Sequence, residues 1–472
     1  MKHFIISVVL FCTTTYSQPI SLRDTTNQYD YIIITVPQLV QTCEQFKTHK
    51  ETIRNFTVLI TDTQQIFQEF YSYGTKQENI RDFISYAGTF WQTPQPKYFL
   101  LAGDLSKVPN DKFPSIPGYP LTDTTRTDYY YSQNLYDVDS LRIDFYVGRV
   151  AARDTIELNN YFQKVINYES DTAIYQWNNN VLLLAQSEYP DGNYWEQLAF
   201  ELSQQLPTSI IKKFIFESDT SEYYGNTDSI LSYVNSNGTS MIFFSGHSNY
   251  QQFTFDSLFD INDVGSIQNG NKYFITMGLY AQYFSDSTVG SISDKLVLSP
   301  FGSIGGFSAV GKAYSFTSNF IYQRFSKYLY SNYRLSLGEV FDSTFYSLTW
   351  FGNETIRLYN VFGDPSLKLK YNIISGTGNP PLEIPTEYSL EQNYPNPFNP
   401  TTKIEFAIPT SGVVTIVLFD ILGKEVATVT KNFYSAGKHT ATVNLSHLSS
   451  GLYFYTMQSG KFIARKKMVL IK

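Results

Sequence analysis

Residues that could do chemistry stand at the ends of two apolar runs in the middle of the chain. The first run, SMIFFS (240–245), is followed by Gly246, His247 and Ser248. The second run, KYFITM (272–277), is followed by Gly278 and Leu279. A neutral imidazole can act as a general base, and glycine lets a backbone amide approach a substrate oxygen closely. His247 is therefore the candidate base, and the amides of Gly246 and Gly278 are candidates for holding an oxyanion.

The elements that position these residues are two predicted strands. Continuous apolar runs rich in Ile and Phe, bounded by Asn, Gly and Ser, are typical of parallel strands buried on both faces. Such strands place functional residues at their carboxyl ends, which meet at one edge of the sheet. We therefore expect His247 and Leu279, which are 32 positions apart, at neighbouring strand ends.

Strands and helices are predicted to alternate on either side of these two runs. Predicted strands lie at 32–35, 57–60, 97–104, 181–186, 210–216 and 302–311, and predicted helices at 37–52, 76–91, 154–170, 192–205, 226–236, 316–330 and 335–348. Alternation of strands with helices of this length indicates βαβ units and a parallel sheet.

The two strand ends, together with four further segments, resemble the gingipain-like cysteine peptidases of family C25, which have a caspase-like fold. The further segments are Leu100-Leu101-Ala102-Gly103-Asp104, Asp128-Tyr129-Tyr130, Val147-Gly148-Arg149 and Phe362-Gly363-Asp364-Pro365-Ser366-Leu367. The resemblance runs in register from about Tyr29 to Leu369. It implies the fold of a cysteine endopeptidase in two α/β subdomains, 18–175 and 176–370, of which the second is the catalytic type.

The resemblance also assigns the site residues. In that family a Gly-His-Gly motif supplies the base, and a Cys upstream of a Phe supplies the nucleophile. Gly246 and His247 match the first motif, whereas Ser248 stands where the family has Gly. Leu279 precedes Phe284 by the family's spacing of five positions, so it stands where the family has its Cys.

Leu279 decides what this site can do. A cysteine peptidase needs a thiolate activated by a histidine, and N–H groups that hold the oxyanion. Leucine cannot ionise or form an acyl intermediate, and removing a nucleophile costs on the order of 10⁶ in rate. Activity would require that a nearby hydroxyl take over, and the candidates are Ser245, Ser248, Tyr280 and Ser285.

We therefore expect a secreted pseudopeptidase that binds peptides, partner proteins or surface polymers through the former substrate cleft. Two alternatives from other classes stay open. One is an active secreted endopeptidase with a non-standard nucleophile, and the other is a structural adhesin that reuses the scaffold. An open cleft beside His247 would favour the binding role over the purely structural one.

The last part of the chain has a different pattern, in which short alternating strands are separated by turn residues. After a Gly- and Pro-rich linker at 371–387, strands are predicted within 413–420, 424–429, 439–445, 451–458 and 461–472. Period-two alternation with regular turn signals indicates a small antiparallel β-sandwich at 388–472.

This closing segment resembles the type A sorting domain of the type IX secretion system. The matching residues are Asn393-Tyr394-Pro395-Asn396-Pro397-Phe398-Asn399-Pro400, Asp420-Ile421-Leu422-Gly423, Leu448-Ser449-Ser450-Gly451-Leu452-Tyr453 and the basic pair Lys466-Lys467. The resemblance implies passage through the periplasm and outer membrane, with the type IX machinery as a partner, to a secreted or cell-surface location. The predicted architecture is thus an α/β, gingipain-type parallel-sheet domain in two subdomains, followed by a small all-β antiparallel sandwich.

The N-terminus indicates export, and the overall charge argues against a nucleic-acid role. Residues 1–17 combine a Lys near the start, a short apolar run and small polar residues, as in a secretory signal peptide cleaved near Ser17. No run reaches the roughly 20 apolar residues of a membrane-spanning helix, so no integral membrane segment is expected. A net charge of −7 offers no electrostatic footprint for nucleic acid.

Cys43 is the one cysteine outside the predicted signal peptide, so no intramolecular disulfide is expected. It lies at helical spacing with Leu39 and Phe46. This spacing predicts a buried helix cysteine rather than a displaced nucleophile.

Three carboxylates on one loop are candidate calcium ligands. Asp137, Asp139 and Asp144 could bind Ca²⁺, which takes several oxygen ligands. Their spacing lacks the full EF-hand pattern, so a solvated acidic turn is the alternative. No other cofactor is expected.

Overall fold

A computed structural model of the chain describes most of the residues that these predictions concern. The described ranges are 20–71, 74–114, 124–136, 143–187, 194–254, 258–278, 290–311, 315–331, 335–346, 356–371, 387–409, 412–434, 437–460 and 462–472. The predicted signal peptide, Leu279, Asp137, Asp139 and most of the predicted linker lie outside these ranges.

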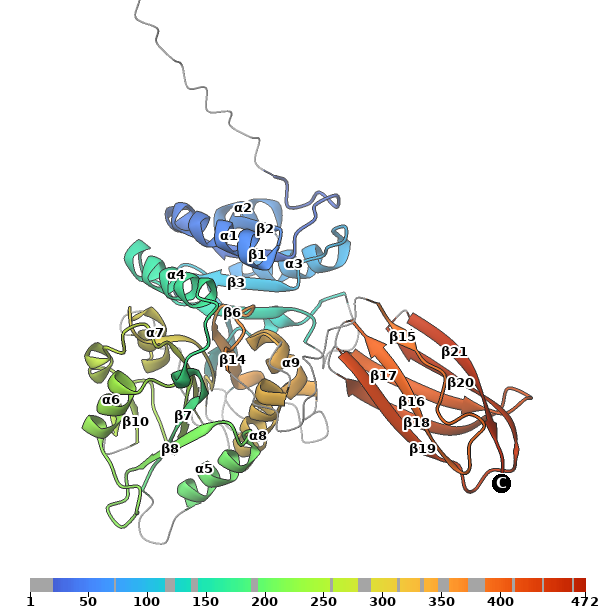
Figure 1. Ribbon diagram of the computed structural model, residues 1–472. Coiled ribbons are helices and arrows are strands. Elements are labelled where there is room, and N and C mark those ends of the chain that lie inside the picture. The colour runs from blue at the N-terminus through green and yellow to red at the C-terminus, as the bar shows by residue number, and fades with distance from the viewer. Residues whose placement is uncertain are drawn as a thin grey trace, which may run out of the picture.

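The described residues before the linker are built on one ten-stranded, mostly parallel sheet with helices on both faces (Figure 1). In spatial order its strands are β2 (Val58–Asp62), β1 (Tyr31–Thr35), β3 (Tyr98–Ala102), β6 (Tyr146–Val150), β14 (Tyr359–Gly363), β13 (Ser303–Ala309), β12 (Phe274–Gly278), β9 (Met241–Ser245), β7 (Asn180–Ala185) and β8 (Ile211–Phe216). The strands from β2 to β6 run parallel to one another, as do those from β13 to β8. β14 lies between the two groups and runs antiparallel to β13. The predicted α/β fold is confirmed.

The strands read as continuous apolar runs because both faces of the sheet are covered. In β9, Met241 and Phe243 pack into one core cluster, whereas Ile242 and Phe244 pack into another cluster. Successive side chains of a strand point to opposite faces, so both sets must be apolar when helices cover both sides.

The helices that cover the sheet follow the strands in the βαβ order expected from the sequence. They are α1 (Val40–Arg54), α2 (Thr63–Glu69), α3 (Lys76–Phe90), α4 (Thr155–Ser170), α5 (Tyr194–Gln205), α6 (Thr227–Ser236), α7 (Ile292–Leu298), α8 (Ser315–Ser331) and α9 (Leu337–Tyr346). Short 3-10 turns are η1 (Pro37–Leu39), η2 (Tyr129–Ser132), η3 (Gln176–Asn179), η4 (Asp263–Ser266) and η5 (Ile356–Leu358). Two small hairpins pair β4 (Asp111–Pro114) with β5 (Thr124–Thr127) and β10 (Gln252–Phe253) with β11 (Phe259–Asp260).

Of the helices and the strands of the ten-stranded sheet, four are missing from the sequence predictions: α2, α7, β6 and β14. β6 has five residues that include Gly148 and Arg149, which interrupt its apolar run. α2 and α7 have seven residues each, which is too short for an apolar period to be readable. Each begins at a side-chain cap, Asp62 for α2 and Ser291 for α7. β14 has five residues that include Asn360 and Gly363, so its strand conformation depends on pairing with β13.

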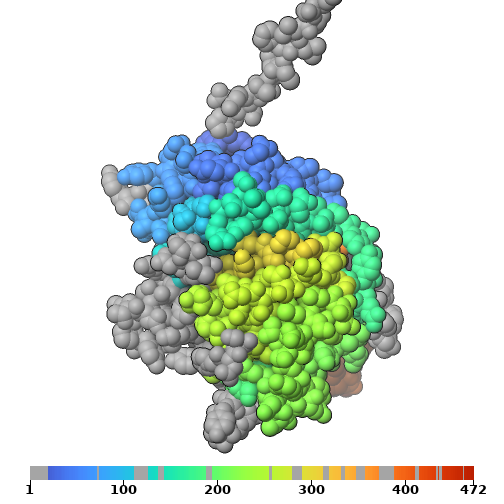
Figure 2. Space-filling model, turned by 90° about the vertical axis from the view of Figure 1, so that its left-hand side faces the viewer, coloured from blue at the N-terminus to red at the C-terminus, as the bar shows by residue number. Residues whose placement is uncertain are grey.

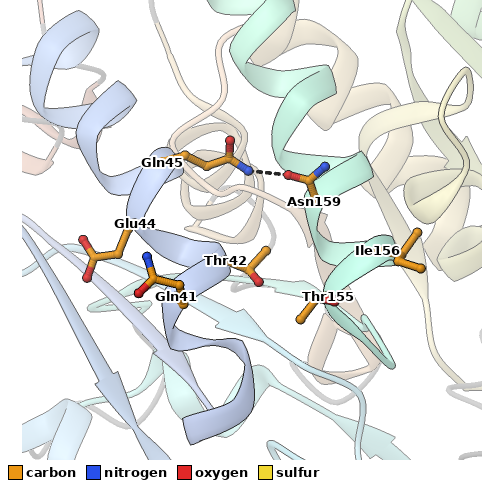
Figure 3. A pocket seen from close by; sticks show the side chains of 7 residues that line it. All are labelled: Gln41, Thr42, Glu44, Gln45, Thr155, Ile156 and Asn159. Atoms are coloured by element: carbon orange, nitrogen blue, oxygen red, sulfur yellow. Dashed lines mark hydrogen bonds between the residues drawn. The ribbon is translucent and has the colours of Figure 1, made fainter.

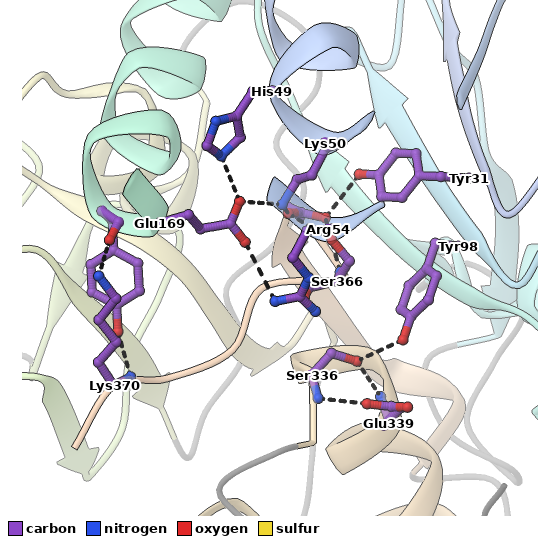
Figure 4. Close-up of polar contacts among 12 residues, drawn as sticks. Tyr31, His49, Lys50, Arg54, Tyr98, Glu169, Ser336, Glu339, Ser366 and Lys370 are labelled. Carbon is purple, nitrogen blue, oxygen red and sulfur yellow. Dashed lines mark hydrogen bonds and ion pairs between the residues drawn. The ribbon is translucent and has the colours of Figure 1, made fainter. Parts of the chain in front are cut away.

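A buried ion network joins α1 and α4 to the segment that follows β14 (Figure 4). Lys50 Nζ lies 2.7 Å from Glu169 Oε2 and 2.6 Å from Asp364 Oδ2, and all three side chains are buried. The hydroxyl of Tyr31, at the start of β1, donates to Asp364 Oδ1 at 2.8 Å. His49 Nε2 lies 2.9 Å from Glu169 Oε2. The network thereby ties the end of the sheet domain to its first strand.

Acid should weaken this network between pH 4.5 and about 2. Burial by itself would raise the pKa of Glu169, but the charge of Lys50 and the hydrogen bond from His49 outweigh burial and lower the pKa to about 2. A carboxyl whose pKa is lower in the folded state stabilises the fold above its unfolded pKa, and this contribution is lost as pH falls through the folded pKa. We expect the free energy of unfolding in urea to decline across this window, and Glu169→Gln to flatten the decline. An equally steep decline in Glu169→Gln would assign the acid sensitivity to other carboxyls.

The described strands after the linker form two antiparallel sheets that make a separate sandwich (Figure 1). One sheet has four strands, in the order β18 (Glu425–Tyr434), β17 (Gly412–Phe419), β20 (Gly451–Ser459) and β21 (Phe462–Leu470). The other has three strands, in the order β15 (Ser389–Leu390), β16 (Thr401–Ile408) and β19 (Gly437–Asn444). The predicted antiparallel sandwich is confirmed.

The Pro-rich segment that opens this sandwich is tied to its sheets through Asn393. Its Nδ2 donates to the Pro395 carbonyl and to Thr402 Oγ1, both at 3.0 Å, and its backbone N–H donates to the Tyr455 hydroxyl at 2.8 Å. A buried polar side chain needs such partners. The asparagine of the sequence motif therefore has a structural role.

The two groups of strands before the linker form one body. In Figure 2 the N-terminal residues, in blue and cyan, lie directly against the later residues, in green and yellow. None of the helices in the described part of the chain is both long and apolar enough to cross a membrane.

Candidate functional site

Three neighbouring strand ends meet where His247 lies. β7, β9 and β12 run parallel, and their carboxyl ends lead to Gln186, to Gly246 and His247, and to Gly278. Gly278 pairs with Phe244 in register, and adjacent strands are roughly 5 Å apart. The structure therefore brings Gly246, His247 and Gly278 to one edge of the sheet. We call Gln186, Gly246, His247 and Gly278 the strand-end site.

Gln186 orients the His247 ring. Its Oε1 accepts the backbone N–H of His247 at 2.6 Å and lies 3.1 Å from His247 Nδ1. Because an amide oxygen can only accept, Nδ1 carries the proton in this hydrogen bond, and the lone pair of the neutral ring is then on Nε2. Of the two tautomers of the neutral ring, this is the one that leaves Nε2 available as a general base.

Packing around the ring leaves little room for other orientations. Trp195 of α5 contacts the His247 ring edge to face, with ring centroids 5.1 Å apart and planes at 78°. A side chain at Gly246 would place its Cβ 2.6 Å from Gln186 Cβ, so only glycine lets Gln186 approach as it does. The backbone thus requires the glycine that the sequence motif contains.

The chain after His247 is held by a threonine in a strained conformation. Thr254 has φ of 69°, which β-branched residues rarely adopt. Its N–H donates to the His247 carbonyl at 2.9 Å, and its Oγ1 donates to Glu217 Oε1 at 2.7 Å while accepting the Leu258 N–H at 3.0 Å. Glu217 also accepts the Ser187 N–H at 2.9 Å. These bonds hold the β10–β11 hairpin against the ends of β7 and β8.

The candidate nucleophile positions are only partly described. Leu279, Tyr280 and Ser285 lie outside the described residues. Ser245 is fully buried in β9, where a substrate carbonyl cannot reach it, and Ser248 is half-buried beside His247. Of the described alternatives, Ser248 alone is accessible.

Cys43 is a buried residue of α1, as predicted. Burial raises the pKa of its thiol to about 12. Because the thiolate is the nucleophilic form, Cys43 is not a displaced nucleophile.

Of the predicted calcium ligands, the structure describes Asp144. Its Oδ2 accepts the Asn134 N–H at 3.0 Å. Over the described ranges, no group of three or more His, Cys, Asp and Glu side chains could hold a metal ion. Calcium binding by the three aspartates stays a prediction, because Asp137 and Asp139 lie outside those ranges.

Sequence reasoning missed Gln186, Trp195 and Glu217 as neighbours of the strand-end site. A signal was present for Gln186 and Glu217, since each is a polar residue that directly follows the last residue of its strand, β7 or β8. Trp195 lies within a helix pattern, and no local spacing distinguishes it from a core residue.

A separate hollow of about 550 Å³ lies between the first turns of α1 and α4 (Figure 3). The amide of Gln45 donates to Asn159 Oδ1 across it, and its lining side chains are mostly exposed. None of the seven residues that line it belongs to the predicted site. We assign it no function.

Comparisons with known proteins agree with both parts of this architecture. The family model for peptidase family C25 matches residues 24–370, and that for the secretion system C-terminal sorting domain matches residues 392–472. No curated protein matches the chain.

Solved structures show the same fold at low identity. The crystal structure of the Arg specific cysteine proteinase gingipain R (RGPB) has a TM-score of 0.59 at 17% identity, and covers 94% of this chain and 98% of that chain. The complex of Porphyromonas gingivalis RgpB pro- and mature domains has a TM-score of 0.58 at 17% identity, covering 93% and 100%.

The sorting-domain match indicates a secreted or cell-surface protein that is exported by the type IX machinery. The C25 match spans most of the chain and includes the whole strand-end site. The chain therefore belongs to peptidase family C25, has the gingipain-like fold and ends in a secretion system C-terminal sorting domain.

Proposed function

We propose that this protein is a secreted pseudopeptidase that binds peptide segments at the strand-end site without cleaving them. The residue that carries the proposal is Leu279, which the resemblance to the family's motifs assigns to the nucleophile position. Leucine offers neither a thiolate nor any other nucleophile. Cys43, the remaining cysteine after the predicted signal peptide, is buried in α1.

Binding is supported by the groups that the site retains. His247 is oriented by Gln186 and Trp195, and it can exchange hydrogen bonds with a peptide backbone. The strained hairpin contact at Thr254 holds the chain beside it in one conformation. Strain of this kind is characteristic of ligand clamps and active sites.

The test measures turnover and binding on the same full chain. Turnover of a broad fluorogenic peptide library by the parent should be no faster than that of His247→Ala. Fluorescence anisotropy of the labelled peptides should show binding that Ser248→Trp weakens, because the indole fills the space beside His247. Ser232→Trp on the exposed face of α6 is the matched control and should leave binding unchanged.

Each alternative function has its own outcome in this test. Turnover that His247→Ala abolishes would show an active endopeptidase with another nucleophile. Absence of both turnover and binding would favour the structural adhesin.

A further inference from the structure

The sorting domain exposes large apolar side chains at one end of its sandwich. Ile421 is 69% exposed and Leu422 is 87% exposed at the tip of the hairpin that joins β17 to β18. Leu452 near the start of β20 is 39% exposed, and Ile471 just after β21 is 49% exposed. None of the four belongs to the core cluster that the described residues of this domain form. We call these four residues the apolar tip.

Strand register brings these four residues together. β17, β20 and β21 are antiparallel neighbours, and the directly opposed residues Phe419, Phe454 and Lys467 form a row across them. Each member of the apolar tip lies a few residues beyond this row, toward the same end of the sheet. In Figure 1 the C-terminus marks this end, which lies away from β15 and the linker. The apolar tip is therefore at the end of the sandwich that is distant from the linker.

The hairpin turn does not depend on its two apolar side chains. Asp420 Oδ1 accepts the N–H groups of Leu422 at 2.9 Å and of Lys424 at 3.0 Å. Gly423 has φ of 80°, a value that favours glycine. The aspartate and the glycine thus shape the turn, whereas the side chains of Ile421 and Leu422 are left in solvent. Apolar side chains that gather on a surface in this way mark interaction sites.

The sorting domain is basic, although the whole chain is acidic. Residues 388–472 contain nine Lys and Arg against four Asp and Glu, a net charge of +5, whereas the rest of the chain contains 26 against 38, a net charge of −12. Lys424 and Lys467 are exposed at the end that carries the apolar tip, and none of the ion pairs among the described residues includes them. The acids at this end, Asp420 and Glu425, already accept hydrogen bonds within the hairpin. The two lysines are therefore available to an anionic partner.

The residue types at this end favour a lipid surface over a protein partner. Protein–protein interfaces are enriched in aromatic residues and Arg and depleted in Lys, and Leu is under-represented among their hot spots. Surfaces that bind membranes peripherally combine apolar side chains, which enter the boundary between headgroups and acyl chains, with Lys and Arg, which attract anionic headgroups. A protruding hairpin with exposed aliphatic side chains and unpaired lysines has the second combination. The sorting-domain match indicates export, so the protein encounters membrane surfaces.

We propose that the apolar tip and its two lysines bind the surface of an anionic lipid bilayer. Ile421 and Leu422 enter the boundary between headgroups and acyl chains, because they are the most exposed members of the apolar tip. Lys424 and Lys467 lie against the phosphates of the headgroups. The binding is peripheral and reversible, since four side chains and two charges are a small contact. The proposal is independent of the strand-end site.

Sedimentation with lipid vesicles tests the proposal. The protein is the chain from residue 18 onward, because the apolar run of the predicted signal peptide would itself bind lipid. One kind of vesicle contains equal parts of phosphatidylcholine and phosphatidylglycerol, and the other contains phosphatidylcholine alone. We expect binding to the anionic vesicles, and Ile421→Ser with Leu422→Ser should weaken this binding about tenfold or more, because two aliphatic side chains no longer leave water.

Two further double variants separate charge from general surface effects. Lys424→Gln with Lys467→Gln should weaken binding to the anionic vesicles about tenfold at low salt, because each lysine is attracted by the headgroup charges. Ile211→Ser with Ile463→Ser is the matched control for the apolar tip. Ile211 is 47% exposed on β8 and Ile463 is 65% exposed at the other end of β21, so this variant should bind as the parent does.

A fluorophore reports insertion directly and keeps the test decisive if a double variant does not fold. The environment-sensitive group NBD, attached to Leu422→Cys, should brighten severalfold on anionic vesicles, because its emission rises when it leaves water. The same group on Ile463→Cys should not change. Cys43 is buried in α1, so the label reaches the introduced thiol.

Circular dichroism melting establishes that each protein is folded. The proposal is overturned if the folded parent does not bind anionic vesicles, or if it binds neutral vesicles equally well. It is also overturned if the folded Ile421→Ser, Leu422→Ser variant binds as the parent does, or if NBD at position 422 is unchanged on vesicles that bind the protein. Absence of vesicle binding would leave a protein of the export machinery as the partner of the apolar tip.

Discussion

Replacing Leu279 by Cys is expected to convert the chain into an active cysteine peptidase. Gln186 already places the lone pair of neutral His247 on Nε2, as a base that activates a thiol requires. Loss of a nucleophile costs on the order of 10⁶ in rate, so its return should raise turnover of a fluorogenic peptide library by a factor on the order of 10³ or more. The gain should disappear in the double variant Leu279→Cys, His247→Ala and after alkylation with iodoacetamide.

A cysteine placed elsewhere provides the matched control for this experiment. Leu422 is 87% exposed on the sorting domain, and Leu422→Cys should give no turnover. If Leu279→Cys is folded but silent, the loss of the thiol is not the only change that inactivated the site. Ser248, which stands where the family has Gly, is then the next position to revert, as Leu279→Cys with Ser248→Gly.

Removing the ammonium of Lys50 should give the largest loss of stability. Lys50 Nζ is fully buried between Glu169 and Asp364, at 2.7 Å and 2.6 Å. Lys50→Met keeps most of the apolar volume but removes the cation that lies between the two buried carboxylates, which leaves Glu169 with His49 and the more distant Arg54. Breaking a buried ion pair in this way costs about 3–5 kcal/mol. The free energy of unfolding in urea measures the loss.

An exposed ion pair of the same chain is the comparison. Arg153 pairs with Glu157 on the first turn of α4, and its side chain is 43% exposed. Arg153→Met should change the free energy of unfolding by no more than about 1 kcal/mol, because solvent screens such pairs. A Lys50→Met variant as stable as Arg153→Met would show that the two acids do not depend on Lys50.

Local patterns in the sequence predicted a large part of the architecture of this protein. The alternation of buried runs and helical segments predicted the α/β sheet, because strands covered on both faces must be apolar throughout. The identities of Gly246 and Leu279 are known from the sequence alone and do not depend on the fold. Turn residues at regular intervals likewise predicted the antiparallel sandwich.

The tertiary structure decided which distant residues meet. Gln186 contacts His247 across 61 positions because β7 and β9 are neighbours in the sheet, although β8 lies between them in the sequence. Lys50 meets Asp364 because β14 returns from the end of the domain into the middle of the sheet. Sequence periodicity reports which face of an element is buried, but not which strands become neighbours. Strand order depends on packing energies summed over the whole sheet, so these contacts appear only once the chain is folded.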